Sequence, residues 1–319
     1  MTELVVVSGK GGTGKTSIVG SLAALSRKKV MVDCDVDAAD LHLILRNQIM
    51  RASEFTGGKR ASIVDDKCTD CGMCLECCRF DAIKHDVSEE NATGEQYWID
   101  PFACDGCGVC TRHCPEMAIE FKEVISGEWY LSDTTYGPLL HARLGLAQAN
   151  SGKLVSLLRQ QARFLAGEKN LDLIIIDGSP GIGCPVIASI TGTDYVLIVT
   201  EPSMSAMHDM DRLLQLTQHF RIPTGICINK ADINLALTAQ IEKYAENQGV
   251  AVLGQVPFDP TVTEAQLART TVVDRQAGSA NIGIRHLWAK LSKALKAQHD
   301  LSNSVEMIQV DEPNKENRQ

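Results

Sequence analysis

Short apolar runs and longer stretches of helical spacing alternate along most of the chain. Runs typical of buried strands occupy residues 3–7 and 28–35, and they recur later in LDLIIIDGSPG, DYVLIVTEP, GICINKAD and AVLGQVPFD. Segments with apolar residues at helical spacing lie between these runs, at 16–26, in SGKLVSLLRQQARFLAG and DMDRLLQLTQHF, and at 282–297. Because strands that alternate with helices form parallel sheets, the pattern predicts an α/β protein with a mostly parallel sheet.

This pattern breaks after Leu45 and resumes at about Leu139. The residues between lack long apolar helices and are rich in Cys, Gly, Asp and Glu. A small domain inserted into one α/β domain explains such a break. The tail after His299 has too little apolar surface to offset its ordering entropy, so we predict that it is disordered. The predicted boundaries are 1–57 and 126–298 for the α/β domain, 58–125 for the insert and 299–319 for the tail.

Composition and charge indicate a soluble globular protein and argue against nucleic-acid and membrane binding. The chain has 319 residues, of which 44% are hydrophobic and 22% charged, as in an ordinary soluble globular protein. Its net charge of -9 argues against sequence-independent nucleic-acid binding, which depends on Lys and Arg neutralising phosphates. The apolar runs are too short to span a bilayer, and we expect the apolar stripe of 282–297 to pack on the sheet rather than on a membrane. Without signal-peptide features, the sequence indicates a cytoplasmic protein.

A glycine-rich stretch between the first predicted strand and the first predicted helix matches the phosphate-binding pattern GxxxxGK[ST]. Its glycines let backbone N–H groups surround phosphate oxygens, and the start of the helix adds a partial positive charge. We expect Lys15 to contact the β- and γ-phosphates and Thr16 to hold Mg²⁺. The nucleotide-contacting residues predicted from this stretch are Gly9, Lys10, Gly11, Gly12, Thr13, Gly14, Lys15, Thr16 and Ser17.

Acidic residues follow two of the predicted strands. Asp177 ends the apolar run LDLIIID, where a Mg²⁺-binding Walker B aspartate is expected, although an aspartate there can also cap the next helix. Four more carboxylates follow the second strand, and they repel one another unless a cation or a ligand uses them. Of these we assign to Asp35 the orientation of the attacking water and a place beside Mg²⁺, with Asp37 as the weaker alternative. Asp33 is interpreted as a structural strand end and Asp40 as a helix cap.

The loop KGGTGKT carries a second lysine, Lys10, that phosphate binding does not need. With this lysine the loop resembles the deviant Walker A loop of the MinD/ParA class of P-loop ATPases (the SIMIBI group), which includes the nitrogenase iron protein. The segments VDCD and DGSPG are similar to the switch regions of that class. The resemblance implies ATP-dependent dimerisation in which Lys10 reaches the partner's ATP, so that Lys10, Lys15 and Asp35 form the catalytic set. A solvent-exposed loop lysine is the alternative.

The residues alone leave the nucleotide base open. Asn229, Lys230, Ala231 and Asp232 match the NKxD pattern of guanine-binding GTPases. The resemblance to the MinD class instead implies ATP, with Asn229 touching adenine and the segment VPFD, which contains Pro257, lining the same pocket. We favour ATP because the deviant loop is the more specific motif.

Eight of the twelve cysteines fall into two runs with the same spacing, CTDCGMCLECC and CDGCGVCTRHCP. Reducing conditions in the cytoplasm favour metal ligation over disulfides. Both runs fit the bacterial ferredoxin pattern, in which the fourth cysteine of each run ligates the cluster of the other. The insert is therefore predicted to be a small α+β domain of the bacterial ferredoxin type with two 4Fe–4S clusters. The first is assigned to Cys68, Cys71, Cys74 and Cys114, and the second to Cys104, Cys107, Cys110 and Cys78.

The first cysteine run departs from the ferredoxin pattern at two positions. Arg79 stands where the run usually has Pro, and its positive charge is expected to raise the potential of the nearby cluster. Cys77 is an extra cysteine beside Cys78. We interpret it as a spare buried thiol, with ligand exchange between Cys77 and Cys78 as the alternative.

Three further cysteines lie outside the runs. Cys34 and Cys227 occur in predicted strands, where core packing is expected for a free cysteine. Cys184 lies in the loop after Asp177, where the resemblance to the nitrogenase iron protein implies a cluster shared between two subunits. That protein contributes two such cysteines per subunit, and no second one lies between residues 130 and 151 here, so a bridging cluster is not favoured.

A MinD-like ATPase interrupted after its second strand by a two-cluster ferredoxin domain is similar to MinD-superfamily ATPases with an inserted ferredoxin domain, over most of the chain. Our leading hypothesis is an ATP-gated electron carrier that passes electrons to an unknown redox partner protein. It would act as a homodimer, or as a heterodimer with a related ATPase. The alternatives are an iron–sulfur or metal-cluster assembly ATPase and a redox-regulated positioning ATPase. No nucleic-acid partner is expected.

Overall fold

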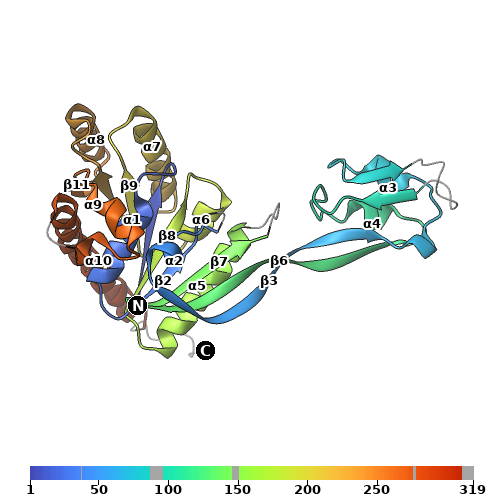
Figure 1. Cartoon of the computed structure of the whole chain (residues 1–319), viewed down its shortest axis with the longest axis horizontal. Coiled ribbons are helices and arrows are strands. Elements are labelled where there is room, and N and C mark those ends of the chain that lie inside the picture. The colour runs from blue at the N-terminus through green and yellow to red at the C-terminus, as the bar shows by residue number, and fades with distance from the viewer. Residues whose placement is uncertain (37, 87–95, 146–150, 276–277, 311–319) are drawn as a thin grey trace, which may run out of the picture.

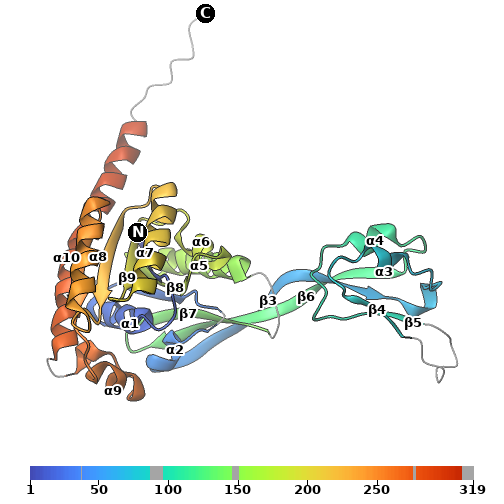
Figure 2. The same ribbon diagram turned by 90° about the horizontal axis from the view of Figure 1, so that it is seen from above.

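The computed structural model describes residues 1–36, 38–86, 96–145, 151–275 and 278–310. These residues form an α/β body and a small cysteine-rich domain, which a long two-stranded antiparallel ribbon connects (Figures 1 and 2). The small domain stands clear of the α/β body in both views, at the far end of the ribbon. One α/β domain is therefore interrupted by a small inserted domain, as the sequence predicts.

A nine-stranded sheet forms the centre of the body, in the order β11-β10-β9-β1-β8-β2-β7-β6-β3. From β11 to β7 every neighbouring pair is parallel, which confirms the predicted α/β fold with a mostly parallel sheet. Strands β1, β8 and β9 read as apolar runs because helices cover both faces of the sheet there. The bounds are β1 (Thr2–Ser8), β2 (Lys29–Asp33), β7 (Gly137–Leu144), β8 (Leu173–Pro180), β9 (Tyr195–Thr200), β10 (Thr224–Asn229) and β11 (Ala251–Val256).

Successive residues of β1 point into two different cores. Val5 and Val7 pack in one core with α5 (Ser151–Glu168), α6 (Cys184–Ile190), α7 (Met204–His219) and α8 (Leu235–Asn247). Leu4 and Val6 pack in the other with α1 (Lys15–Leu25), α2 (Leu41–Ile44), α9 (Thr261–Leu267), the 3₁₀ turn η2 (Val272–Asp274) and α10 (Ser279–Val310). Side chains alternate along a strand, so one apolar run supplies both layers of the body.

Strands β3 (Asn47–Ile63) and β6 (Ile119–Thr134) complete the sheet and extend out of it as the ribbon. They pair antiparallel along their length, and β6 also pairs with β7 inside the body. Most of their residues are exposed or half-buried and show no sustained alternation, which is why the sequence does not predict them. The predicted domain boundaries at 57/58 and 125/126 fall inside this ribbon, where its register shifts near Thr56 and Gly58.

The inserted domain consists of two short helices and a hairpin. Helices α3 (Met73–Cys77) and α4 (Val109–His113) each begin after a glycine with positive φ, Gly72 and Gly108, inside a cysteine run. The hairpin pairs β4 (Ile83–Asp86) with β5 (Gln96–Ile99), and the 3₁₀ turn η1 (Asp65–Lys67) leads in from the ribbon. The core of this domain is small and contains Ala61, Cys74, Ile83 and Ile119.

The last helix is longer than the sequence predicts. Helix α10 continues to Val310, so the prediction of a disordered tail is wrong for 299–310, whereas 311–319 lie outside the described residues. No Gly or Pro occurs between Ile284 and Glu312, and extending an existing helix costs far less than starting one. Leu287 and Leu291 are fully buried against the sheet, as predicted for the apolar stripe. Among the described residues, no helix is long and apolar enough to cross a membrane.

Candidate functional site

The loop between β1 and α1 forms one wall of a large open cavity. Gly9 packs against α7, since a Cβ there would lie 2.2 Å from Cβ of Asp209. Gly14 has φ +86°, and a Cβ there would lie 2.3 Å from Nδ2 of Asn229. Both positions therefore require glycine. The predicted loop residues that line the cavity are Gly11, Gly12, Thr13, Gly14, Lys15, Thr16 and Ser17, whereas Gly9 and Lys10 lie outside its lining.

Lys15 lies buried among carboxylates at this cavity. Its Nζ is 2.5 Å from Oδ1 of Asp177 and 3.8 Å from Oδ2 of Asp35. Burial lowers the pKa of Lys15, but the ion pair with Asp177 and the nearby charges of Asp33 and Asp35 outweigh burial and raise it. Oδ2 of Asp177 and Oγ1 of Thr13 are buried and have no hydrogen-bond partner among the described residues. The Asp177 oxygen suits hydrated Mg²⁺ as an acceptor, and the Thr13 hydroxyl can donate to a phosphate oxygen.

The acids after β2 divide into different roles. Asp33 is fully buried and accepts hydrogen bonds from the backbone N–H groups of Leu41 (2.9 Å) and Asp35 (3.1 Å), which agrees with the predicted structural role. Burial, followed by repulsion from Asp177, raises the pKa of the Asp33 carboxyl. Asp35 lines the phosphate cavity, as an acid that orients water must.

Asp40 and Asp37 are the other two acids of this segment. Asp40 is the N-cap residue of α2, as predicted, although its side chain makes no capping hydrogen bond. Only its backbone carbonyl accepts from Leu43 and Ile44, and Asp40 lines the phosphate cavity with those two residues. Its carboxylate is therefore available to the cavity rather than to the helix. Asp37 lies outside the described residues.

A second cavity adjoins the loop and is the candidate nucleoside pocket. Asn229 and Pro257 line it together with Val256, Phe258 and the loop residue Gly14, among others. Asn229 Nδ2 also donates to the carbonyl of Thr13 at 2.7 Å, which ties the end of β10 to the phosphate loop. The resemblance to the MinD class implies a pocket with Asn229 and the VPFD segment in its wall, and both line this cavity.

The NKxD aspartate does not face this pocket. Oδ1 of Asp232 accepts a hydrogen bond from the backbone N–H of Phe258 at 2.6 Å, and Asp232 does not line the cavity. A guanine-reading aspartate needs its carboxylate for the base. The geometry therefore favours a structural role for Asp232, in line with the expectation of adenine. Gln266, which the sequence analysis missed, lines both cavities and donates to Oγ of Ser17 at 2.6 Å.

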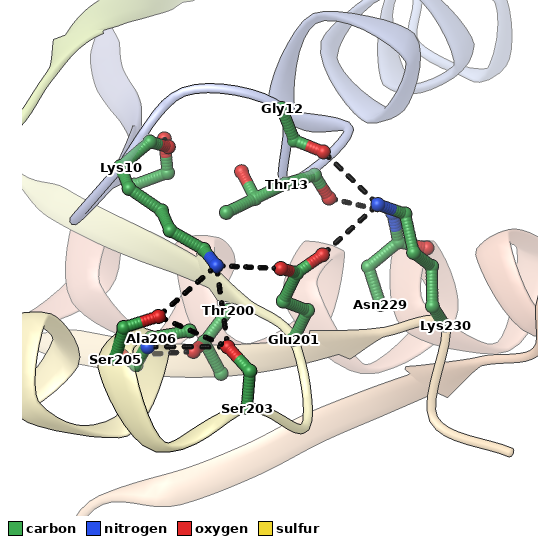
Figure 3. Close-up of polar contacts among 11 residues, drawn as sticks. Lys10, Gly12, Thr13, Thr200, Glu201, Ser203, Ser205, Ala206, Asn229 and Lys230 are labelled. Carbon is green, nitrogen blue, oxygen red and sulfur yellow. Dashed lines mark hydrogen bonds and ion pairs between the residues drawn. The ribbon is translucent and has the colours of Figure 1, made fainter. Parts of the chain in front are cut away.

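Lys10 does not line the phosphate cavity of its own chain, and its ammonium points toward Glu201, Ser203 and Ser205 (Figure 3). Its Nζ lies 2.8 Å from Oε1 of Glu201 and 3.2 Å from the hydroxyls of Ser203 and Ser205, in the loop after β9 and at the start of α7. Oε2 of Glu201 pairs with Lys230 at 2.9 Å. Sequence reasoning missed these partners because no motif marks them.

The eight motif cysteines gather around two cavities in the inserted domain. The first is lined by Cys68, Cys71, Cys74 and Cys114, and the second by Cys78, Cys104, Cys107 and Cys110. Each cavity thus takes three cysteines from one run and the fourth from the other, the same division that the ferredoxin pattern predicts. Cys77 also lines the second cavity, although its Sγ donates to the carbonyl of Cys74 at 3.3 Å.

The arrangement of these cysteines suits a cluster better than a single ion. Four motif cysteines surround each cavity. A single Zn²⁺ needs its thiolates about 2.3 Å from one point. Within the part of the chain that the structure describes, no group of three or more His, Cys, Asp or Glu side chains is arranged to hold one metal ion. Thiols spread around a larger space fit a 4Fe–4S cluster.

Helix α2 connects the phosphate cavity with the base of the ribbon. Its residue His42 stacks on His141 of β7, with ring centroids 4.8 Å apart and planes 5° apart, and His141 stacks in turn on Tyr130 of β6. Nε2 of His141 is 2.9 Å from the hydroxyl of Ser132. Because Leu43 of the same helix lines the phosphate cavity, one short element contacts both the nucleotide site and the strands that continue into the ribbon.

The remaining cysteines agree with the interpretation drawn from their positions. Cys34 and Cys227 are fully buried in the two cores of the body. Cys184 is exposed at the first residue of α6. No cysteine among the described residues lies beside it in a metal-holding group, so a site within one chain is not formed there.

Known proteins resemble the chain over most of its length. Residues 4–272 match the family model described as the CobQ/CobB/MinD/ParA nucleotide binding domain. An uncharacterized protein of Methanocaldococcus jannaschii is 31% identical over 294 residues, which cover 91% of this chain and 96% of that protein. A second uncharacterized protein of the same organism is 24% identical over 73% of this chain and 83% of its own length.

Other similarities concern the insert and the fold. A ferredoxin of Hydrogenibacillus schlegelii, named as a 7Fe ferredoxin, is 34% identical over 71 residues, which are 22% of this chain and 82% of that protein. The solved structure of the cell division ATPase MinD from Pyrococcus furiosus superimposes with a TM-score of 0.55 at 16% identity, covering 92% of this chain and 99% of that one, which shows a common fold. The chain therefore belongs to the MinD/ParA class of P-loop ATPases and carries a ferredoxin-like domain inserted at the edge of its sheet.

Proposed function

We propose that this protein binds and hydrolyses Mg·ATP as a dimer and uses that cycle to gate electron transfer through two 4Fe–4S clusters in its inserted domain. One observation carries the proposal. Strand β2, which ends at Asp33 beside the phosphate cavity, pairs with β7, β7 pairs with β6, and β6 continues into the domain that holds the thiol-lined cavities. One hydrogen-bonded sheet thus joins the phosphate cavity to the domain that holds the thiol-lined cavities.

The side chains at the nucleotide cavity have complementary tasks in hydrolysis. Lys15 exchanges its carboxylate partners for phosphate oxygens, which frees Asp177 to face Mg²⁺ together with Thr16. When bound, Mg²⁺ neutralises charge on the phosphates. Asp35 orients the attacking water, and Lys10 of a second chain adds positive charge as ATP is cleaved.

The nucleotide is proposed to be ATP. Asn229 and Pro257 line the nucleoside pocket, whereas the carboxylate of Asp232 is already bonded to the backbone of Phe258 and is not available to a guanine. A competition assay checks this assignment. GTP at a concentration equal to that of ATP should leave bound ATP in place, and displacement by GTP would overturn the assignment.

The insert supplies ligands for the redox centres. We assign the first cluster to Cys68, Cys71, Cys74 and Cys114, and the second to Cys78, Cys104, Cys107 and Cys110. A bound 4Fe–4S cluster supplies one-electron chemistry at a potential that its surroundings set. The guanidinium of Arg79 lies 5.0 Å from the ring centroid of Phe80, which lines the second cavity. This positive charge favours the reduced, more negative state of the second cluster.

The assembly partner is a second copy of this chain or a related ATPase. Two proteins of one organism, Methanocaldococcus jannaschii, resemble this chain, which supports a heterodimer as the alternative to a homodimer. The electron acceptor is a redox protein that contacts the inserted domain. That domain stands clear of the body at the end of the ribbon, so a partner has access to it (Figure 2).

The deciding experiment is anaerobic. The reduced holoprotein is mixed with a one-electron acceptor dye, and cluster reoxidation and sedimentation are followed with and without MgATP. We expect MgATP to produce dimers and to change the reoxidation rate several-fold. Lys10→Ala should abolish both effects, whereas Lys243→Ala, an exposed position on α8, should change neither.

Other outcomes point to the alternatives. If MgATP changes the oligomer and leaves reoxidation unchanged, electron gating is wrong, and a positioning ATPase explains the data better. If instead iron leaves the holoprotein for an apo-ferredoxin when MgATP is added, cluster assembly is the better account.

A further inference from the structure

All hydrogen-bond donors of the Lys10 ammonium are used inside its own chain (Figure 3). Nζ donates to Oε1 of Glu201 at 2.8 Å and to the hydroxyls of Ser203 and Ser205, each at 3.2 Å. An ammonium has three donors, so none is left for a further strong contact. In this arrangement Lys10 cannot also contact a phosphate bound to another chain.

Glu201 links Lys10 to the phosphate loop. Its second oxygen, Oε2, pairs with Nζ of Lys230 at 2.9 Å, and the same Nζ donates to the carbonyl oxygen of Gly12 at 3.0 Å. The carboxylate thus lies between the two lysines, with one oxygen for each. Partial burial alone raises the pKa of Glu201, but the hydrogen bonds from Lys10 and Lys230 outweigh burial and lower it.

The loop that offers this contact is itself held in place. Glu201 follows the last residue of β9, a strand buried along its length. Oγ of Ser203 caps α7 by accepting from the backbone N–H of Ala206 at 3.3 Å. Because the backbone around Glu201 is fixed, its carboxylate determines where the flexible Lys10 side chain lies.

We propose that Glu201 is a positioning residue that holds Lys10 on its own chain and so sets the concentration at which two chains assemble. The inference rests on the proposed function, in which Lys10 serves the partner's nucleotide. Lys10 cannot be at Glu201 and at the partner's phosphates at once, so a symmetric dimer must break the contact twice. The phosphates of bound ATP then compete with Glu201 for the same ammonium.

The first test measures the contact in the absence of nucleotide. The anaerobic holoprotein is treated with a limiting amount of an amine-acetylating reagent, and modification of Lys10 is compared by mass spectrometry with that of the exposed Lys243. Side chains of Lys10 and Glu201 are 32% and 18% exposed, so solvent screens the pair in part. We expect Glu201→Gln to speed acetylation of Lys10 about fivefold. Lys230→Met, which leaves Glu201 in place, should not.

The second test measures assembly by sedimentation with MgATP. Because the contact breaks once in each subunit, a fivefold effect per chain predicts that Glu201→Gln dimerises at a concentration about 25-fold lower than wild type. Ser205→Ala removes one of the three acceptors of the Lys10 ammonium and leaves the contact between Glu201 and Lys230 intact. It should lower the dimerisation concentration by a smaller factor. Glu201→Asp, which keeps the charge, should restore much of the wild-type behaviour.

The outcomes separate this inference from the proposed function. If Lys10 is acetylated at the same rate in wild type and Glu201→Gln, the holding contact is wrong. If acetylation speeds up but dimerisation of Glu201→Gln is unchanged or weaker, the positioning role is wrong. If neither wild type nor any variant dimerises with MgATP, the proposed function fails along with the assembly role, while the acetylation rates still decide whether Glu201 holds Lys10.

Discussion

At the scale of single residues, Gly14 shows how closely the nucleotide site is packed. Its φ of +86° is unfavourable for any residue with a Cβ, and a Cβ would lie 2.3 Å from Nδ2 of Asn229. Asn229 in turn holds the carbonyl of Thr13. A side chain at position 14 therefore displaces the loop and the nucleoside pocket together.

We expect Gly14→Ala to weaken nucleotide binding by about tenfold or more, because both the backbone conformation and the Asn229 contact are lost. Isothermal calorimetry with ADP measures the effect. The matched control is Gly167→Ala in α5, where a Cβ would meet no atom within 4 Å. That variant should bind like wild type, and equal losses in both variants would show that the local contact at Gly14 is not the cause.

His141 makes stability depend on pH. Burial, followed by repulsion from His42, lowers its pKa from 6.5 to about 4. Below about pH 6.5 the unfolded chain therefore binds a proton that the folded chain refuses until about pH 4. The stability that neutral His141 contributes to the fold is fully present above pH 6.5 and is lost as the pH falls toward 4. For this one group the loss between pH 7 and pH 5 is about 2 kcal/mol.

The test of this titration uses amide hydrogen exchange in β7 at pH 7 and pH 5, corrected for the intrinsic rates. The groups that face His141 are His42 from α2, Tyr130 and Ser132 from β6. The double variant His141→Phe, Ser132→Ala keeps the stack without a titrating ring or an unpaired hydroxyl. Between pH 7 and pH 5 we expect this variant to lose about 2 kcal/mol less stability than wild type. An identical pH dependence would exclude His141 as the source.

At the scale of elements, a buried arginine joins three parts of the body. Nη1 of Arg159 in α5 donates to the carbonyl oxygens of Ala188 and Thr191 at the end of α6, at 2.7 and 2.8 Å. Its Nη2 pairs with Glu3 of β1 at 2.7 Å. Helix α6 begins beside the phosphate cavity, at Cys184 and Pro185, so this clamp also positions one rim of the site.

Replacing Arg159 by Met should destabilise the fold by about 3 kcal/mol, because two buried carbonyls and a buried carboxylate lose partners. Arg163 still pairs with Glu3 and keeps the loss from being larger. Urea unfolding followed by circular dichroism measures it. Arg163→Met is the control, since its side chain is 45% exposed, and it should cost about 1 kcal/mol or less. Equal costs would contradict the clamp.

Elements differ in how far the sequence predicts them. Strands β1 and β8 are apolar runs because they are buried on both faces, and the glycine and cysteine motifs have fixed spacing, so these parts follow from local pattern. The ribbon does not, because its strands are held by pairing with each other rather than by a buried face. Contacts such as that of Lys10 with Glu201 join residues far apart in sequence and need the fold before they can be seen.

At the scale of the whole molecule, the two domains differ in what stabilises them. The body has two extended cores, one on each face of its sheet. Among the described residues, the core cluster of the insert has four buried members, one of them a cysteine that lines the first cavity. A domain with so small a core is usually stable only with metals or cross-links, because metal binding supplies its folding free energy. The ribbon keeps the insert away from the body, so loss of one structure need not affect the other (Figure 1).

Removing iron with a chelator should therefore unfold the insert and spare the nucleotide site. We expect amides of α3, α4 and β5 to exchange as in an unfolded chain, those of β1 and β8 to stay protected, and ADP affinity to change less than about twofold.

Cys71→Ser, which removes one ligand of the first cavity, should lower the iron content, whereas Cys184→Ser, outside both cavities, should not. Gating of electron transfer requires that the nucleotide act on a folded insert. The effect of MgATP should therefore disappear when the iron is removed, while the protein still binds ADP. If ADP affinity instead falls together with the iron, the insert stabilises the nucleotide site directly, and the path through β7 and α2 carries folding free energy as well as a signal.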